Sequence, residues 1–274
     1  MGNKLDQLVD SYPKGSVFLT SWLEKEGISK SLQQKYRKSK KLKSIGRGAM
    51  VMFNQTPNIF GAISALQNQS NLKVHIGSTT SLIIINKTHD VYFTIPNVDL
   101  FGDIGQKLPK WFINYDWDLE IDYRTSNMLP QSIGLIQKKH DGHKLTISCH
   151  ERALLEQMYS APNRANLEKC FLSFEMISSP NIPFIQRMLE NSKSAKANRV
   201  FLLFSENILP SKLFRKLNPL RIKLGNHLIT LSKPGVKEPK YNMMLPYDLV
   251  AKDFNLGRGL IKTITDIHYG ERRV

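Results

Sequence analysis

Apolar positions in the first fifty residues recur at helical spacing and then alternate, so they predict helices followed by strands. Three short helices are expected, over residues 3–11, about 20–26 and about 30–40. In the third, Leu32 and Tyr36 lie one turn apart and share a face, and Ser29 is placed to cap its start. Two apolar segments then flank the glycine-bounded tip Gly46–Gly48, which is typical of a β-hairpin. Helix, helix, turn, helix and hairpin is the order of a winged helix-turn-helix.

Beyond Gln55–Asn58, the natural domain boundary, the pattern mixes helices and strands. Helices are expected over residues 59–66, 149–160, 163–177 and 181–205, the last with a break near Ser194. Strands are expected over residues 72–76, 91–95, 144–148, 221–224, 227–231 and 241–245, with two or three more between 113 and 137. Residues 78–86 hold a β-branched run that suits either a strand or a buried helix. The expected fold class is α+β, with a winged helix-turn-helix domain over residues 1–56 and a larger mixed α/β domain over residues 57–274.

Composition narrows the class of protein. Hydrophobic residues make up 41% of the 274 residues, enough for packed cores, and the formal net charge is +16. A charge of this sign and size indicates a polyanionic partner, either nucleic acid or an anionic membrane. No apolar run approaches the ~20 residues that span a bilayer, and the first residues do not read as a signal peptide. We therefore expect a cytoplasmic protein that makes no membrane contact, with Cys149 and Cys170 as reduced thiols.

Half of the net charge comes from residues 30–47, which carry eight basic side chains and no acidic one. In a helix-turn-helix, the start of the second helix meets base edges in the major groove. Glutamine pairs with adenine and arginine with guanine, whereas lysines suit phosphates and an arginine at a hairpin tip suits the minor groove. The predicted DNA-binding residues are Lys30, Gln33, Gln34, Arg37, Lys38, Lys40, Lys41, Lys43 and Arg47. The alternative is a solvated basic face without a partner.

The remaining motifs favour structural roles over catalysis. Ser148 and Glu151 have the spacing of a helix capping box, and no nucleophile-elbow glycines surround them. His140 and His143 flank a turn dipeptide, so we expect solvent-facing histidines and no metal. The glycine-rich nucleotide-binding loops are absent from the sequence. We therefore predict no catalytic residues, no metal and no cofactor.

Four acidic residues alternate along the chain, and on one strand all four would point to the same face. They are Asp116, Asp118, Glu120 and Asp122. A solvated sheet face is the favoured interpretation. A magnesium site or an acidic patch for a basic partner stays open, because carboxylate oxygens suit that ion.

Several motifs resemble the AbiEi family of antitoxins from the abortive-infection type IV toxin–antitoxin systems. In the N-terminal part they are Trp22–Glu24, Gly27–Ser29, Tyr36 and Leu42–Gly48. In the second part they are Val74–Gly77, Leu108–Phe112 and, most specific, Leu145–Glu156. The family tends to have proline where this chain has His150, so the start of that helix departs from its pattern.

The resemblance implies a helix over residues 78–86 and a winged helix followed by an antitoxin domain. It also implies a repressor of its own operon that binds double-stranded promoter DNA at repeated half-sites in the nucleoid. Its functional partner would be a nucleotidyltransferase-like toxin, and direct contact with that toxin stays undecided. Two alternatives remain: a toxin-modifying enzyme that uses phosphoryl transfer, and a ligand-sensing transcription regulator.

Overall fold

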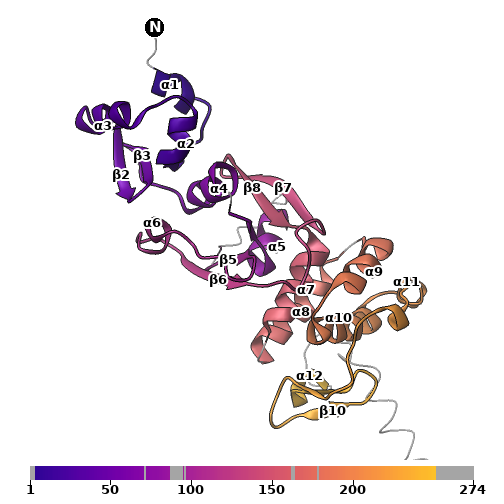
Figure 1. Ribbon diagram of the computed structural model, residues 1–274. Helices are drawn as coiled ribbons and strands as arrows, with labels where there is room; N and C mark the ends of the chain where they lie inside the picture. The colour runs from indigo at the N-terminus through magenta and orange to yellow at the C-terminus, as the bar shows by residue number, and fades with distance from the viewer. Residues whose placement is uncertain are drawn as a thin grey trace, which may run out of the picture. The chain divides into compact units, whose positions relative to one another are not determined.

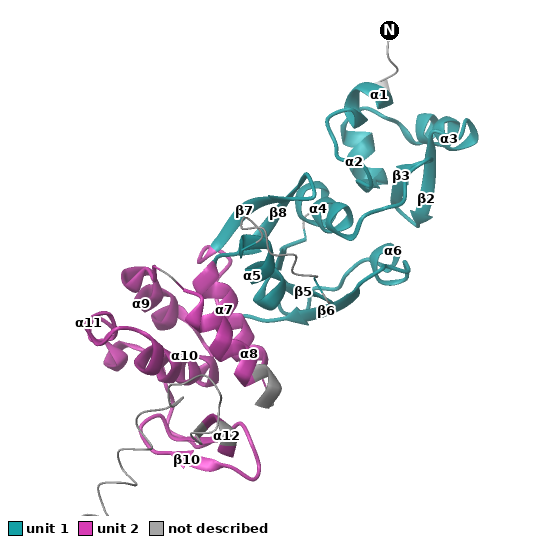
Figure 2. Ribbon diagram, turned by 180° about the vertical axis from the view of Figure 1, so that it is seen from behind, with its two compact units in different colours: residues 1–127, 135–149 teal, residues 128–134, 150–274 magenta. Residues whose placement is uncertain are grey.

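The computed structural model describes residues 4–70, 72–86, 95, 97–161, 164–177 and 179–250 (Figure 1). The chain divides into two compact units, shown in different colours in Figure 2. The first comprises residues 1–127 and 135–149, and the second comprises residues 128–134 and 150–274.

The first unit begins with three helices and a three-stranded antiparallel sheet. Its elements are α1 (Lys4–Val9), β1 (Phe18–Leu19), α2 (Thr20–Lys25), α3 (Lys30–Lys38), β2 (Leu42–Gly46) and β3 (Ala49–Met52). The strand order is β1-β3-β2. A small core holds the layers together, formed by Leu5, Phe18, Leu23, Ile28, Tyr36, Leu42 and Met50. The three helices and the hairpin are confirmed, and we call residues 4–53 the helix–hairpin segment.

The rest of the first unit is built around a five-stranded mixed sheet of order β6-β5-β4-β8-β7. Its strands are β4 (Val74–Ile76), β5 (Asn97–Gly102), β6 (Glu120–Thr125), β7 (Leu135–His140) and β8 (His143–Ser148), and its helices are α4 (Ile59–Gln69), α5 (Ser78–Asn86) and α6 (Lys110–Ile113). The helix over residues 78–86 is confirmed as α5. The strand predicted over residues 91–95 lies outside the described residues except at Ile95, and β5 was not predicted.

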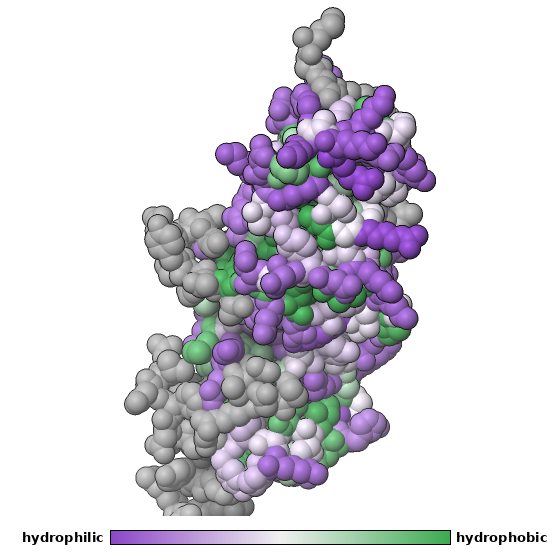
Figure 3. Space-filling model, turned by 90° about the vertical axis from the view of Figure 1, so that its left-hand side faces the viewer, coloured by the Kyte–Doolittle hydropathy of each residue, from purple (hydrophilic) through white to green (hydrophobic). Residues whose placement is uncertain are grey.

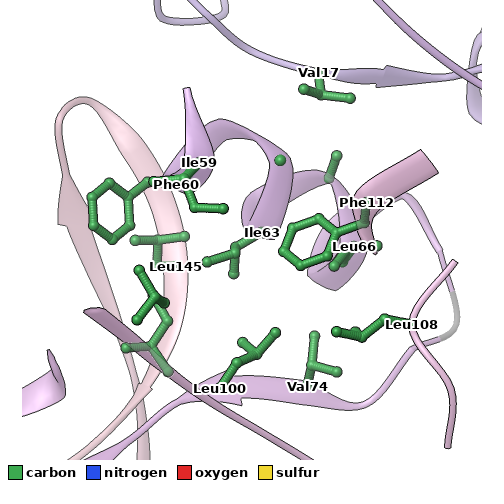
Figure 4. Close-up of a cluster of buried hydrophobic side chains, with 14 of the residues drawn as sticks. Val17, Ile59, Phe60, Ile63, Leu66, Val74, Leu100, Leu108, Phe112 and Leu145 are labelled. Carbon is green, nitrogen blue, oxygen red and sulfur yellow. The ribbon is translucent and has the colours of Figure 1, made fainter. Parts of the chain in front are cut away.

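Helix α4 ties the helix–hairpin segment to this sheet. The buried Gln69 amide accepts from Leu19 N at 2.8 Å and donates to Val17 O at 2.9 Å, so it fixes the segment's β1. Two residues earlier, Gln67 accepts from Thr146 N at 2.8 Å and donates to Thr146 O at 2.9 Å, so it fixes β8. The main core runs from Val17 through α4 to the sheet (Figure 4). The domain boundary at residue 56 therefore falls within a continuously packed unit, and it stays a prediction.

The second unit is helical with a small sheet. Its helices are α7 (His150–Ser160), α8 (Arg164–Glu175), α9 (Ile182–Asn191), α10 (Ala195–Ile208), α11 (Ser211–Phe214), the 3-10 helix η1 (Pro219–Arg221) and α12 (Tyr247–Val250). Its strands are β9 (Ile229–Thr230), β10 (Val236–Glu238) and β11 (Met243–Leu245), in the order β10-β11-β9. The break near Ser194 is confirmed, since the Ser194 side chain accepts from Ala197 N and starts α10. The strand predicted over residues 221–224 is wrong, because η1 occupies its start.

Candidate nucleic-acid interface

Helix α3 is positioned by a cap at its start and by apolar anchors on one side. The Ser29 hydroxyl accepts from Leu32 N at 3.3 Å, which satisfies an amide that the helix leaves without a partner. Tyr36 is buried in the segment's core, and Leu32 packs against it. The helix therefore presents its basic side to solvent, where Lys30, Gln34, Lys35, Arg37 and Lys38 are exposed.

The structure corrects the prediction that Gln33 contacts DNA. Its side chain is only 2% exposed, and its amide donates to Thr20 O at 3.1 Å and to Ile28 O at 2.9 Å. It therefore holds α3 against the preceding helix and turn, and it is not available to read a base. Adjacent glutamines on a helix point in different directions, so Gln34 is exposed where Gln33 is buried.

A groove of about 590 Å³ lies between α3 and the hairpin. Five of the predicted DNA-binding residues line it, namely Lys30, Gln33, Gln34, Arg37 and Arg47, and all but the buried Gln33 are exposed. Figure 3 shows hydrophilic side chains crowded over this N-terminal part of the chain. The structure thus brings together the predicted base-reading residues of the helix and the arginine at the hairpin tip.

The hairpin tip rests on α6. A Cβ placed at Gly46 would lie 2.7 Å from the Cβ of Trp111, so only glycine permits this approach. Gly48 has a φ of +95°, a conformation that side chains disfavour, and its carbonyl accepts from Thr20 N at 2.9 Å. Arg47 stands exposed between these two fixed glycines. We did not predict from the sequence that α6 supports the hairpin. The only hint was the adjacent pair of large apolar residues, Trp111 and Phe112, whose burial requires a partner.

The other basic residues have different surroundings. Lys41 makes an ion pair with Asp6 at 3.1 Å, which neutralises part of its charge. Lys40 is exposed at the turn after α3, and Lys43 is half-buried on β2. Lys30 lies 3.9 Å from Glu24 but keeps 79% of its side chain exposed. DNA contact by these four residues stays a prediction.

The alternating acidic residues do not share one strand, which is a correction. Strand β6 begins at Glu120, so Asp116 and Asp118 precede it. Asp122 is engaged by Arg124, whose Nε donates at 3.0 Å. In the part of the chain that the structure describes, no group of three or more histidine, cysteine or acidic residues is arranged to hold a metal ion. The single carboxylate face on which the magnesium interpretation depended is therefore absent.

The structure also corrects the prediction that His140 and His143, at the turn between β7 and β8, face solvent, because both are buried. His140 is 7% exposed and packs edge-on against Phe60 at a centroid distance of 4.5 Å. His143 is 3% exposed, and its Nδ1 lies 3.5 Å from Ser16 Oγ. They sit where the β7–β8 hairpin packs against α4 and the helix–hairpin segment, so they join the two parts of the first unit.

Acid should weaken this joint. Burial lowers the pKa of His143; Asp141 opposes that shift, and His140 adds to it. The unfolded ring takes up a proton near pH 6.5, whereas the folded ring resists until lower pH, so stability falls as pH drops below about 6.5. Urea unfolding at a series of pH values should show a shallower acid-side decline for His143→Gln than for the native chain. The exposed His227 provides the control, and an unchanged slope in His143→Gln would contradict this role.

The residues around Ser148 have a structural role at the end of β8. The Ser148 carbonyl accepts from Ser81 Oγ at 2.6 Å, and α7 begins two residues later. The capping box with Glu151 stays a prediction.

Cys149 and Cys170 are both thiols, as expected, and burial raises the pKa of Cys170 to about 12. Among the described helices, none has the length and apolar character needed to cross a bilayer.

A helix with an exposed basic side lies across a groove from a hairpin tip that carries an exposed arginine, an arrangement typical of transcriptional regulators that bind DNA through a helix-turn-helix. Comparison with family models places the chain more closely. Residues 1–93 match the model described as "Transcriptional regulator, AbiEi antitoxin N-terminal domain". Residues 96–246 match the model described as "Transcriptional regulator, AbiEi antitoxin, Type IV TA system". The chain belongs to the AbiEi antitoxin family of type IV toxin–antitoxin transcriptional regulators, so the resemblance drawn from its motifs is confirmed.

The fold is also similar to a solved structure. The crystal structure of the RV2827C protein from Mycobacterium tuberculosis matches with a TM-score of 0.52 and 12% identity, over 83% of this chain and 85% of that chain. At this identity the likeness concerns the fold alone. Comparison with curated proteins gave no match.

Proposed function

We propose that this protein represses its own toxin–antitoxin operon by binding promoter DNA through the helix–hairpin segment, which acts as a winged helix-turn-helix. The observation that carries the proposal is the groove between α3 and the hairpin, lined by Lys30, Gln34, Arg37 and Arg47. Its width is set by fixed elements, because Gly46 is pressed against Trp111. Gln34 and Arg37 read base edges, Arg47 enters the minor groove, and the neighbouring lysines hold phosphates.

The proposal extends to the rest of the chain. Residues 1–56 bind DNA and residues 57–274 form the antitoxin domain, which counteracts a nucleotidyltransferase-like toxin. The protein works in the cytoplasm, is not an enzyme and uses no cofactor. Two molecules occupy repeated half-sites on one promoter. Membership in a family of antitoxin regulators supports this reading.

The salt dependence of DNA binding tests the proposed face. Lys38 is exposed near the end of α3, so its ammonium group suits a phosphate contact. Lys38→Ala should lower affinity equally for all sequences and flatten the slope of log K against log salt by about one. Fluorescence anisotropy with a labelled promoter fragment at several salt concentrations measures both quantities.

The matched control is Lys237→Ala, which removes one exposed lysine from β10 in the second unit. It should leave the slope unchanged. An equal change in both variants would mean that bulk charge, and not the α3 face, drives binding. No change in Lys38→Ala would mean that this face does not meet the phosphates.

A further inference from the structure

A cavity of about 540 Å³ lies in the first unit, between α6, the segment that follows it and β6. Its size is within the range of small-molecule sites, about 300–1,000 Å³. Most of the lining side chains are aromatic or aliphatic: Leu108, Phe112, Ile113, Tyr115, Trp117, Leu119, Ile121 and Tyr123. The remaining lining residues are three acids, Asp116, Asp118 and Glu120.

Three aromatic rings form a connected wall. The centroid of Trp117 lies 4.5 Å from that of Tyr115 and 5.5 Å from that of Phe112. The indole Nε1 of Trp117 donates to Phe112 O at 2.7 Å, which folds the segment back onto α6. The polar edge of the indole is therefore already satisfied within the protein. Phe112 is fully buried, so the ring surfaces open to a ligand are those of the partly exposed Tyr115 and Trp117.

The charge of the cavity is opposite to that of the chain. No lysine or arginine is among its lining residues, in a protein with a net charge of +16. Asp116, Asp118 and Glu120 are all exposed, so their carboxylates face solvent at the mouth of the cavity. Aromatic faces attract cations, and carboxylates add to that attraction.

We propose that this cavity binds a small organic cation, an ammonium or guanidinium group carried on an aromatic or aliphatic body. The body fills the apolar space between α6 and β6, and the charged head faces Trp117 and the aspartates. An anion would meet three like charges, and a neutral compound would gain only the apolar contacts.

The cavity also connects to the DNA-binding hairpin. Helix α6 has only four residues, and Phe112 and Ile113 line the cavity while Trp111 supports Gly46. A ligand that displaces Trp117 acts on Phe112 through their hydrogen bond and so on α6. Occupancy therefore changes the position of the hairpin tip and lowers promoter affinity. This regulatory half rests on the proposed function, whereas the binding half does not.

Titration of the full chain tests binding directly. Benzyltrimethylammonium serves as the aromatic cation and agmatine as the aliphatic guanidinium, with benzyl alcohol and benzenesulfonate as neutral and anionic matches. Isothermal calorimetry and tryptophan fluorescence should both detect binding of the cations. Their affinity should be at least about tenfold higher than that of benzyl alcohol or benzenesulfonate. Asp116→Asn with Asp118→Asn should weaken the cation about tenfold. Asp10→Asn, an exposed acid of the helix–hairpin segment, should have no effect.

The possible outcomes test cation binding and its effect on DNA binding separately. Equal binding of cation, neutral compound and anion, or full affinity in the double variant, would overturn the site. Because both aspartates are exposed, we expect that variant to keep the fold, so a change in its affinity for the cation reports on the cavity. Anisotropy with a promoter fragment should show at least about threefold weaker DNA binding at saturating cation. Cation binding without that change would overturn the coupling. Failure to bind DNA at all would overturn the proposed function and leave the calorimetric result standing.

Discussion

Replacement of Arg199 by methionine is expected to lower the free energy of unfolding by at least about 3 kcal/mol. The side chain is 2% exposed on α10, and its guanidinium donates to four main-chain carbonyls. They are Leu224 O at 2.6 Å, Gly225 O at 2.6 Å, His227 O at 2.7 Å and Asn242 O at 3.0 Å. Methionine fills similar space but removes all four donors, and a hydrogen bond to a charged group contributes about 1.5–3 kcal/mol.

Equilibrium urea unfolding, followed by circular dichroism, measures the loss. The matched control is Arg221→Met, since Arg221 is an exposed arginine of the same unit that pairs with Glu190 at 3.0 Å. An exposed ion pair contributes about 0–1 kcal/mol, so the control should change little. Arg199→Lys should fall between the two, because an ammonium group cannot match the planar fork of donors. A loss below about 1 kcal/mol in Arg199→Met would contradict the role of this arginine as the anchor of residues 224–227.

Short-range signals account for what the sequence could predict. Ser29 caps α3, Leu32 and Tyr36 anchor it, and glycines bound the hairpin tip, all within a few residues of the feature they specify. The basic side of α3 follows, because the apolar anchors fix which side faces solvent. The groove lined by Arg37 and Arg47 was predictable for this reason.

The misplaced residues depend on partners that lie in other elements of the fold. Gln33 and His143 were assigned to solvent because burying a polar group is costly unless it finds a partner. Thr20 O supplies that partner for Gln33, and Ser16, 127 residues away, lies against His143. The start of β6 at Glu120 is set by pairing with β5, where Asn97 lies opposite, so alternation alone placed Asp116 and Asp118 wrongly on the strand. No local pattern contains that information.

The combined variant Arg37→Ala with Arg47→Ala is expected to weaken promoter binding by about a hundredfold at physiological salt, or about 3 kcal/mol. The two guanidinium groups line opposite walls of one groove, Arg37 on α3 and Arg47 at the hairpin tip. An arginine that contacts a base contributes about 1–3 kcal/mol, and two on separate elements should add approximately. Anisotropy titrations with the promoter fragment and with a scrambled duplex measure affinity and preference together. The ratio between the two duplexes should shrink in the variant.

The control must remove the same charge elsewhere. Lys212→Ala with Arg215→Ala takes two exposed basic residues from the second unit, and it should retain the native preference for the promoter. If both double variants lose affinity equally and neither loses preference, the groove does not read sequence.

Co-expression with the cognate toxin adds an independent readout. Because we propose that residues 57–274 carry the antitoxin activity, Arg37→Ala with Arg47→Ala should still restore growth while the operon is derepressed. Loss of rescue in a variant that remains folded would show that DNA binding and antitoxin activity share one surface.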